Sequence, residues 1–179
     1  MKKKTIVTLV VIGFVIFLLG MPVWHYQFGY NFRTVEKGVF YGSRQMSGRV
    51  LESTVHKYGI KTVISLRGEN PGKPWYDEEV ETCERLGVKH VSFGWSKSHL
   101  PDPESLASFV DLLESGERPF LAHCEGGTHR AGVASACYLL LHGSDPATAR
   151  GQFGPGFNDA PIGKLVDLYE QSGMPFKKW

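Results

Sequence analysis

The sequence predicts an α/β fold in which a mostly parallel central sheet is flanked by helices and is preceded by one N-terminal transmembrane helix. Short apolar runs alternate with segments of helical periodicity, which is the pattern of a parallel sheet with helical crossovers. A long uncharged run follows the lysines at the start of the chain and predicts the membrane helix. We therefore expect an anchor and linker over residues 1–29, a folded domain over residues 30–175 and a tail over residues 176–179.

The N-terminal segment joins three lysines at positions 2–4 to an apolar run from Ile6 to Val23. About 20 such residues in a helix span a bilayer, and the basic flank stays in the cytoplasm. The prediction is a single-pass membrane protein whose domain lies on the extracytoplasmic, periplasmic side. A signal peptide that is cleaved to give a secreted protein is the alternative. Trp24 and Tyr26 are typical of interfacial anchors and favour a retained helix.

Apolar spacing and glycine stop signals predict the first half of the domain. Apolar residues from Val50 to Tyr58 recur with helical spacing, and Gly59 directly after them indicates the end of a helix. The mainly apolar run from Ile60 to Leu66 is typical of a strand that is buried on both faces. These signals give a hairpin over Phe28–Tyr41, a helix over Gly48–Tyr58, a strand over Ile60–Leu66 and a helix over Tyr76–Leu86.

Capping residues and prolines predict the second half of the domain. Asp102 or Pro103 begins a helix that ends at Ser115, because Asp is a common N-cap and Pro is favoured in the first turn. The helix from Ala131 to His142 is apolar almost all round, as expected of a buried helix. The remaining elements are a strand over Val88–Phe93, a strand over residues 119–122, a helix that begins at Pro146 and a final helix over Ala160–Ser172.

Charge and cysteine content exclude several classes of protein. The net charge of +2 and the pI near 8.4 are too mild to indicate a nucleic-acid partner. Three cysteines, Cys83, Cys124 and Cys137, form an odd set, which argues against a disulfide scaffold. Cys83 and Cys137 occupy apolar helical positions, so we expect them in the core. The sequence contains no Cys-x-x-Cys or His-x-x-x-His pattern, so no metal is expected. The reaction considered below needs no organic cofactor either.

The stretch from His123 to Arg130 follows an apolar strand and precedes a helix. The backbone N–H groups of such a loop, together with the positive end of the helix dipole, hold a phosphate-like dianion. The same field stabilises a thiolate, which makes Cys124 the expected nucleophile. Arg130 can hold two phosphate oxygens at once with its planar guanidinium group. Gly126 and Gly127 allow the loop to turn tightly.

The motif His-Cys-x-x-Gly-x-x-Arg, which begins at His123, resembles the signature of cysteine-dependent protein tyrosine and dual-specificity phosphatases. Residues 42–47 also resemble, in an altered order, the Arg-Ser-Gly-Gln-Pro type of segment found in small bacterial and plant-fungal atypical members. The resemblance implies a fold of the cysteine phosphatase type and a phosphomonoester hydrolase with a phosphocysteine intermediate. His123 is implied to orient the loop through hydrogen bonds. The implied phosphate-binding positions are Glu125, Gly126, Gly127, Thr128, His129 and Arg130.

Two further positions follow from the resemblance. In this family an upstream Asp on a mobile loop protonates the leaving oxygen, and Asp102 is the candidate because Leu100-Pro101-Asp102 resembles an Ile-Pro-Asp segment of the plant and fungal members. The alternative is that Asp102 only caps the helix that follows it. Ala131 stands where the family usually has a Ser or Thr that assists breakdown of the phosphocysteine. We therefore expect that breakdown to be slow.

A phosphorylated protein or a small phosphomonoester is the expected substrate. The carboxylate of Glu125 repels polyanions and favours phosphotyrosine-like esters. In contrast, the pair His129-Arg130 resembles the His-Arg pair of atypical members that accept inositol polyphosphates. Arg67, at a strand end, either helps to hold the substrate anion or is a solvated charge. A rhodanese-like sulfurtransferase, which also uses a cysteine in a strand-to-helix loop, and a phosphate-binding module without turnover are the alternatives. The sequence leaves the oligomeric state open.

Overall fold

The computed structural model describes the backbone of residues 3–179 and the side chains from residue 8 onward, except those of residues 16, 18, 19, 22 and 23. Residues 1 and 2, which begin the predicted N-terminal segment, lie outside the described residues. The helices and strands are α1 (Lys3–Gln27), β1 (Arg33–Glu36), β2 (Phe40–Arg44), α2 (Gly48–Tyr58), β3 (Thr62–Ser65), α3 (Pro74–Leu86), β4 (Lys89–Ser92), α4 (Pro103–Ser115), β5 (Phe120–Cys124), α5 (His129–Leu141), α6 (Pro146–Arg150), the 3-10 turn η1 (Pro161–Gly163) and α7 (Lys164–Ser172).

The five strands form one mixed sheet in the order β1-β2-β5-β3-β4. β2, β5, β3 and β4 run parallel to their neighbours, and only the edge strand β1 is antiparallel. The predicted hairpin is therefore present, but its second strand lies inside the sheet. β5 is the central strand, and Cys124 at its end pairs with Arg44 of β2. Ligand sites of open α/β sheets lie at this carboxyl edge.

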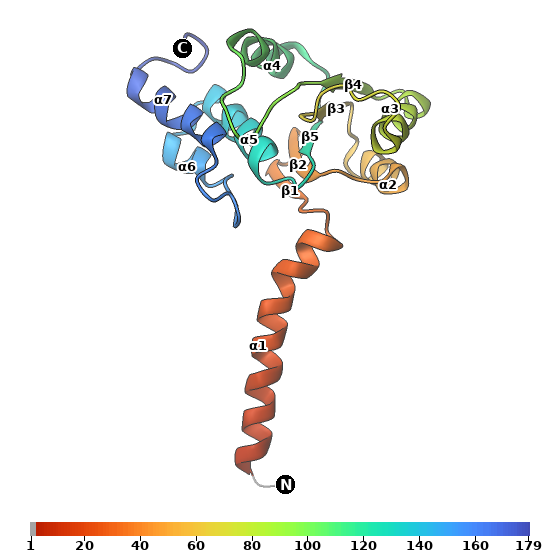
Figure 1. Cartoon of the computed structure of the whole chain (residues 1–179), viewed down its shortest axis with the longest axis vertical. Coiled ribbons are helices and arrows are strands. Elements are labelled where there is room, and N and C mark those ends of the chain that lie inside the picture. Colours follow the sequence, from red (N-terminus) through yellow and green to blue (C-terminus); the bar gives the residue numbers. More distant parts are fainter. Residues whose placement is uncertain (1–2) are drawn as a thin grey trace.

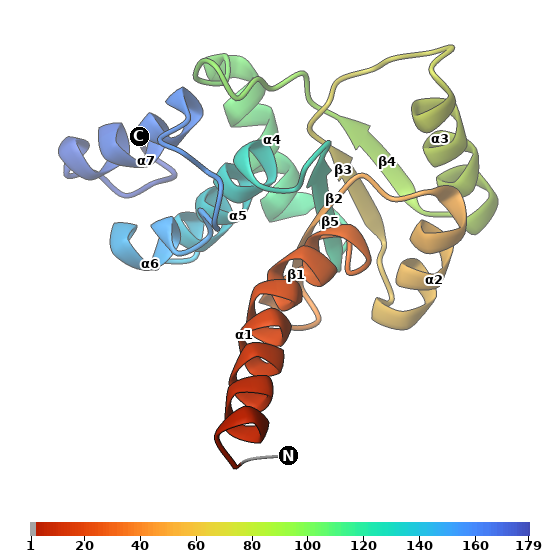
Figure 2. The same cartoon turned by 60° about the horizontal axis from the view of Figure 1, so that its bottom comes forward.

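Helices cover both faces of the sheet (Figures 1 and 2). α2 and α3 lie on one face, and α5 lies on the other with α4, α6 and α7 around it. Side chains of β5 alternate between the two faces. Phe120, Ala122 and Cys124 belong to the core on the α5 side, while Leu121 belongs to the core beneath α2 and α3. The residue before the predicted nucleophile, His123, therefore faces away from α5 and contacts α3 through Glu79.

Local chemistry explains where the helices begin and end. α2 and α3 end at Gly59 and Gly87, each with φ near +65°, a conformation that glycine adopts without steric cost. α4 begins after Asp102, which caps it as expected. α5 starts at His129, earlier than predicted, because the signature loop turns directly into its first turn. The predicted final helix is divided into η1 and α7.

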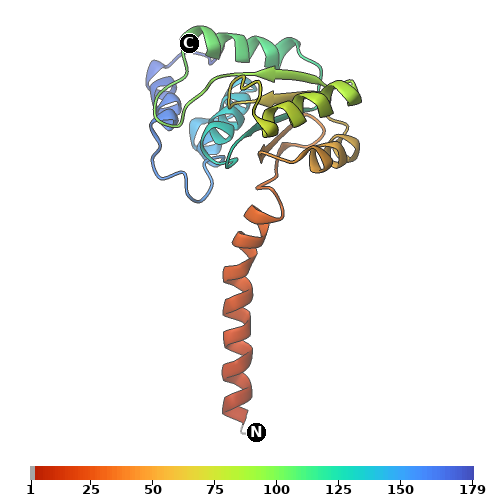
Figure 3. The same ribbon diagram turned by 45° about the vertical axis from the view of Figure 1, so that its right-hand side comes forward.

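The C-terminal tail, residues 176–179, packs against the domain. Phe176 is buried in the α5-side core, and its ring contacts Tyr169 of α7 edge-on. Trp179 contacts the same tyrosine ring. The tail ends near α4, on the side of the domain away from α1 (Figure 3).

The predicted transmembrane helix is wrong. α1 forms within the predicted anchor and extends away from the domain (Figures 1 and 3). However, the part of the chain that the structure describes holds no helix with both the length and the apolar character needed to cross a membrane. The predicted membrane partner is therefore not supported, and the predicted single-pass, periplasmic location is wrong.

Candidate active site

Cys124 lies at the edge of the sheet, where a pocket of about 570 Å³ opens over the signature loop, the segment from His123 to Arg130. Five residues of that loop line the pocket, including Cys124, Glu125 and Arg130, and residues 95–98 form the wall contributed by the loop after β4. Tyr26 also lines it. A second cavity of about 540 Å³, between α4, α7 and the tail, is lined mainly by apolar side chains and contains no signature-loop residue. The chemistry therefore belongs to the first pocket.

Side chains from outside the signature loop fix the direction of its peptide groups. Asn31 Nδ2 donates to the Gly126 carbonyl at 3.1 Å, and Arg33 Nη1 donates to the Gly127 carbonyl at 2.6 Å. Because a trans peptide holds its C=O and N–H in opposite directions, the N–H groups of the same two planes point the other way. α5 begins at His129, and the first turn of a helix leaves its N–H groups unpaired. These donors and the positive helix end form a cradle for an anion.

Gly127 holds the signature loop against β2. Its φ is +72°, and a Cβ there would lie 2.5 Å from the Arg44 backbone N and 2.7 Å from the Ser43 carbonyl carbon. Only glycine fits so close to another backbone. The adjacent contact is also backbone to backbone, because Gln45 N–H donates to the Cys124 carbonyl at 2.8 Å. The loop is thus tied to the sheet at both ends of its turn.

Two arginines lie near the nucleophile position on different elements. Arg130 Nη1 donates to the Leu66 carbonyl at 3.1 Å, which holds its guanidinium group at the pocket wall. Arg33 is partly buried beside the loop. Burial lowers the pKa of Arg33 to about 10, while the negative charge of Cys124 acts in the opposite direction. Arg33 thus supplies a positive charge at the Gly127 carbonyl, whereas Arg130 supplies one at the wall of the pocket.

A buried carboxylate lies on the far side of the strand. Glu79 of α3 is 3% exposed, and its carboxylate accepts hydrogen bonds from His90 Nε2 at 2.9 Å and from Gln45 Nε2. His123 Nε2 lies 3.0 Å from Glu79 Oε2. Burial raises the pKa of Glu79, but the charges of His123 and His90 outweigh it and bring the value to about 2. His123 thus contacts α3 through this carboxylate, and its expected role in orienting the loop stays a prediction.

The domain that contains this pocket matches a known protein family. The model for PTP-SAK, described as a Swiss Army Knife protein, DSP-PTPase phosphatase domain, matches residues 30–162. The chain belongs to this family. It is a cysteine-dependent phosphatase of the protein tyrosine and dual-specificity class, so the sulfurtransferase and the module without turnover are not supported.

Solved structures show that the phosphatase shares its fold with several proteins. TpbA of P. aeruginosa is 20% identical over 84% of this chain and 90% of that chain, with a TM-score of 0.61. Tk-PTP is 19% identical over 80% and 97% of the two chains, with a TM-score of 0.63. The catalytic core of SIW14 from S. cerevisiae is 21% identical over 78% and 85%, with a TM-score of 0.62.

Asp102 of the phosphatase lies outside the pocket that holds Cys124. It is exposed at the start of α4, where its Oδ1 accepts from the backbone N–H of Glu104 at 2.8 Å and of Ser105 at 3.2 Å. This is the geometry of a helix cap. The structure therefore does not bring the candidate acid to the pocket. It does bring Glu125 and the other pocket-lining residues of the loop together around Cys124.

Arg67 is near the site without lining the pocket. Its guanidinium group stacks 3.5 Å above the Trp75 ring centroid and donates to Gln45 Oε1 at 3.1 Å. Burial is the largest influence and lowers the pKa of Arg67, while the charges of Glu125 and Cys124 are among those that raise it. The strand-end arginine is therefore neither fully solvated nor in contact with the pocket.

The sequence did not identify the residues that support the loop. Asn31 and Arg33 are 95 and 94 residues from their partners in the loop, and Glu79 is one of several acids on α3. No local pattern distinguishes them. As expected, Cys83 and Cys137 are core residues, and burial raises the pKa of each thiol to about 12. Within the described residues, no group of three or more His, Cys, Asp or Glu side chains could hold a metal ion.

Proposed function

We propose that this phosphatase hydrolyses phosphotyrosine-like monoesters, with Cys124 as nucleophile and Arg130 and the loop N–H groups as the phosphate site. The observation that carries the proposal is the cradle, whose carbonyls bond to Asn31 and Arg33 so that its N–H groups are left for an anion. Cys124 stands at the start of that cradle and lines the same pocket as Arg130.

The reaction has two steps. The Cys124 thiolate attacks phosphorus, an S–P bond forms, and the P–O bond to the leaving group breaks. Arg130 and the cradle stabilise the charge on the three equatorial oxygens. Water then attacks the phosphocysteine, the S–P bond breaks, and inorganic phosphate and the thiolate are released. No cofactor supplies a group in either step.

A single phosphate on a neutral aryl group fits the charges of the pocket. Glu125 lines it, so a second phosphate near that carboxylate would be repelled. A TpbA variant has been solved in complex with phosphotyrosine, while SIW14 is described as a PP-IP phosphatase. We expect a higher kcat/KM for an aryl phosphate than for an inositol polyphosphate. The reverse order would contradict this assignment.

Replacing the nucleophile tests the mechanism. Cys124→Ser should lower kcat/KM for an aryl phosphate by at least about 10³-fold, because an alcohol is a far weaker nucleophile than a thiolate. The matched control is Cys83→Ala, which removes a buried thiol on the opposite face of the sheet and should leave kcat/KM unchanged. Equal loss in both variants would mean that the effect comes from misfolding.

The general acid requires a separate experiment. We propose Asp102 for this role, which requires the loop before α4 to move toward the pocket when substrate binds. Asp102→Asn keeps an N-cap, whereas Asp102→Ala removes it. If Asp102 is the acid, Asp102→Asn lowers kcat/KM more for an alkyl phosphate than for p-nitrophenyl phosphate, whose leaving group needs no proton. Wild-type kinetics in Asp102→Asn, with lower stability only in Asp102→Ala, would leave capping as its sole role.

A further inference from the structure

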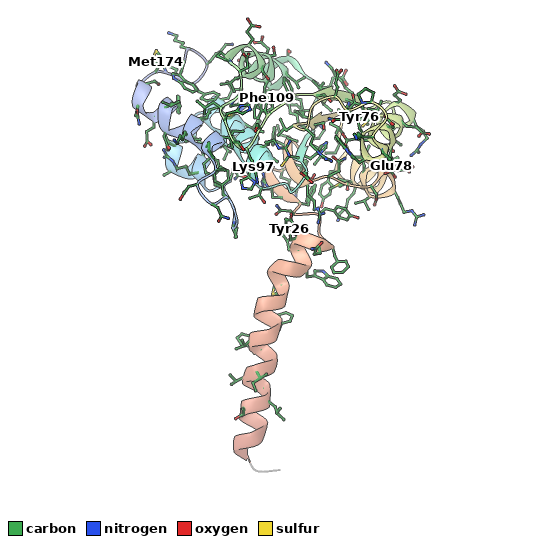
Figure 4. All side chains as sticks on the ribbon, viewed as in Figure 1. Tyr26, Tyr76, Glu78, Lys97, Phe109 and Met174 are labelled. Carbon is green, nitrogen blue, oxygen red and sulfur yellow. The ribbon has the colours of Figure 1, made fainter. Side chains whose placement is uncertain are left out.

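Tyr26 is part of the active-site pocket although it lies outside the matched domain. It is near the C-terminal end of α1, before residue 30 where the family match begins. Figure 4 shows Tyr26 where α1 meets the domain, with Lys97 nearby in the domain. Both residues line the pocket that contains Cys124. From the sequence, Tyr26 was predicted to be an interfacial anchor, but its position in the wall of the pocket does not support that prediction.

Arg44 fixes the position of Tyr26 relative to the nucleophile. The Arg44 guanidinium carbon lies 5.0 Å from the Tyr26 ring centroid, and its Nη1 donates to the Tyr26 carbonyl at 3.3 Å. The same nitrogen donates to Gln27 Oε1 at 3.4 Å. In the sheet, the Arg44 backbone pairs with Cys124. One residue therefore connects the end of α1 to the strand that carries the nucleophile.

The Tyr26 side chain reaches from this attachment to the signature loop. A Cβ on Gly126 would lie 3.1 Å from Tyr26 Oη, so the hydroxyl rests directly against the loop. Tyr26 is also 39% exposed, which leaves part of its surface open at the pocket. An aromatic surface beside a phosphate cradle favours a substrate that has a ring next to its phosphate, because aromatic pairs attract beyond the area that they bury.

We propose that Tyr26 forms an aryl subsite, which contacts the ring of an aryl phosphate while the signature loop holds the phosphate. The inference deepens the proposed function and rests on it, because the ring is placed by a phosphate that is bound in the cradle. It makes the end of α1 a determinant of substrate choice between aryl and alkyl esters.

Binding to the full-length Cys124→Ser protein tests the subsite without turnover. Titration calorimetry gives Kd for phosphotyrosine and for inorganic phosphate, which carries no ring. Tyr26→Ala should weaken phosphotyrosine binding about three- to tenfold and leave phosphate binding within about twofold. Tyr26→Phe keeps the ring and should retain the preference for phosphotyrosine. Trp24→Ala is the matched control, since Trp24 is an aromatic residue of the same helix, 66% exposed and outside the pocket lining.

Each other outcome overturns the subsite. If Tyr26→Ala weakens both ligands equally, Tyr26 supports the loop and does not contact the aryl group. If Tyr26→Ala and Trp24→Ala behave alike, the pocket wall has no role in recognition. If the parent binds neither ligand, the phosphate cradle itself is wrong, and the proposed function fails together with the subsite. In the active enzyme, Tyr26→Ala should raise KM for an aryl phosphate and leave KM for phosphoserine unchanged.

Discussion

The two faces of the sheet differ sharply at the end of β5. On the α5 face, Cys124 is surrounded by an apolar core, and the groups that would hold an anion are mainly backbone donors. On the opposite face, His123 contacts the buried Glu79 carboxylate, which also contacts His90 and the Gln45 amide. Neighbouring residues of one strand thus serve different purposes, because consecutive strand side chains point to opposite faces.

The difference shows how a small domain can hold a charged site in place. The pocket face depends on close backbone approach, where shape is decisive. The far face depends on compensated charge, because a buried carboxylate is tolerated only when cations or donors surround it. Substitutions on the two faces should therefore have different effects. Those on the pocket face should lower kcat/KM, and those on the far face should lower stability in a way that depends on pH.

Among substitutions of residues that support the nucleophile, the largest effect is expected on the pocket face, from Gly127→Ala. The new Cβ would meet the Arg44 backbone N at 2.5 Å, and the φ of +72° adds strain, so the cradle cannot keep its shape. We expect kcat/KM for an aryl phosphate to fall by about 100-fold or more. Gly38→Ala is the control, because Gly38 has φ +77° with nothing within 4 Å of the new Cβ. It should lower stability without lowering kcat/KM, and a similar loss of activity in both would contradict the shape argument.

The far face should respond through stability and pH. Glu79→Gln removes the charge that His90 and His123 compensate, which should cost about 3 kcal/mol at pH 7. The folded pKa of Glu79 is about 2, below its unfolded value near 4.3, so its contribution is complete above pH 5 and is lost as pH falls toward 2. Urea unfolding at pH 7 and pH 3 measures this.

The control for the far face is Glu81→Gln, an exposed acid on the same helix, which should change stability little at either pH. The difference in the free energy of unfolding between wild type and Glu79→Gln should be smaller at pH 3 than at pH 7. An equal difference at both pH values would show that Glu79 acts through packing and not through its charge.

Of the changes on the two faces of the sheet, the smallest effect, up to about tenfold, is expected at Ala131. Its side chain is buried and offers no hydroxyl to the departing thiolate, and Thr128 Oγ1 lies 3.5 Å from the Gly126 carbonyl and 3.4 Å from Asn31 Nδ2. We expect a stoichiometric burst of phenol in a rapid aryl phosphate assay. Ala131→Ser should shrink the burst and raise kcat up to about tenfold, since a hydrogen bond to a charged group contributes roughly 1.5–3 kcal/mol. Linear product release that Ala131→Ser leaves unchanged would place the slow step elsewhere.

Local chemistry made much of the fold predictable. Gly59, Gly87 and the Asp102-Pro103 pair act within one helical turn, so their effects can be found from neighbouring residues. The strand, loop and helix around Cys124 were predictable for the same reason.

Contacts between distant segments were not predictable in this way. Arg33 supports Gly127 across 94 residues, and Glu79 lies 44 residues from His123 in sequence. Apolar periodicity carries no information on such pairs. The same limit explains why the pocket position of Tyr26 was missed. An aromatic residue after an apolar run is typical of a membrane interface, but in the structure Tyr26 lines the pocket with residues that are distant in sequence.

The burial of Cys83 and Cys137 bears on how the enzyme meets an oxidant. Burial raises the pKa of both thiols to about 12, so neither is a thiolate at neutral pH. Peroxide reacts with thiolates, and the proposed Cys124 thiolate opens to the pocket. A sulfenic acid formed there finds no reactive thiol among the chain's own cysteines with which to close a disulfide. Recovery of the oxidised enzyme therefore depends on a thiol supplied from outside the chain.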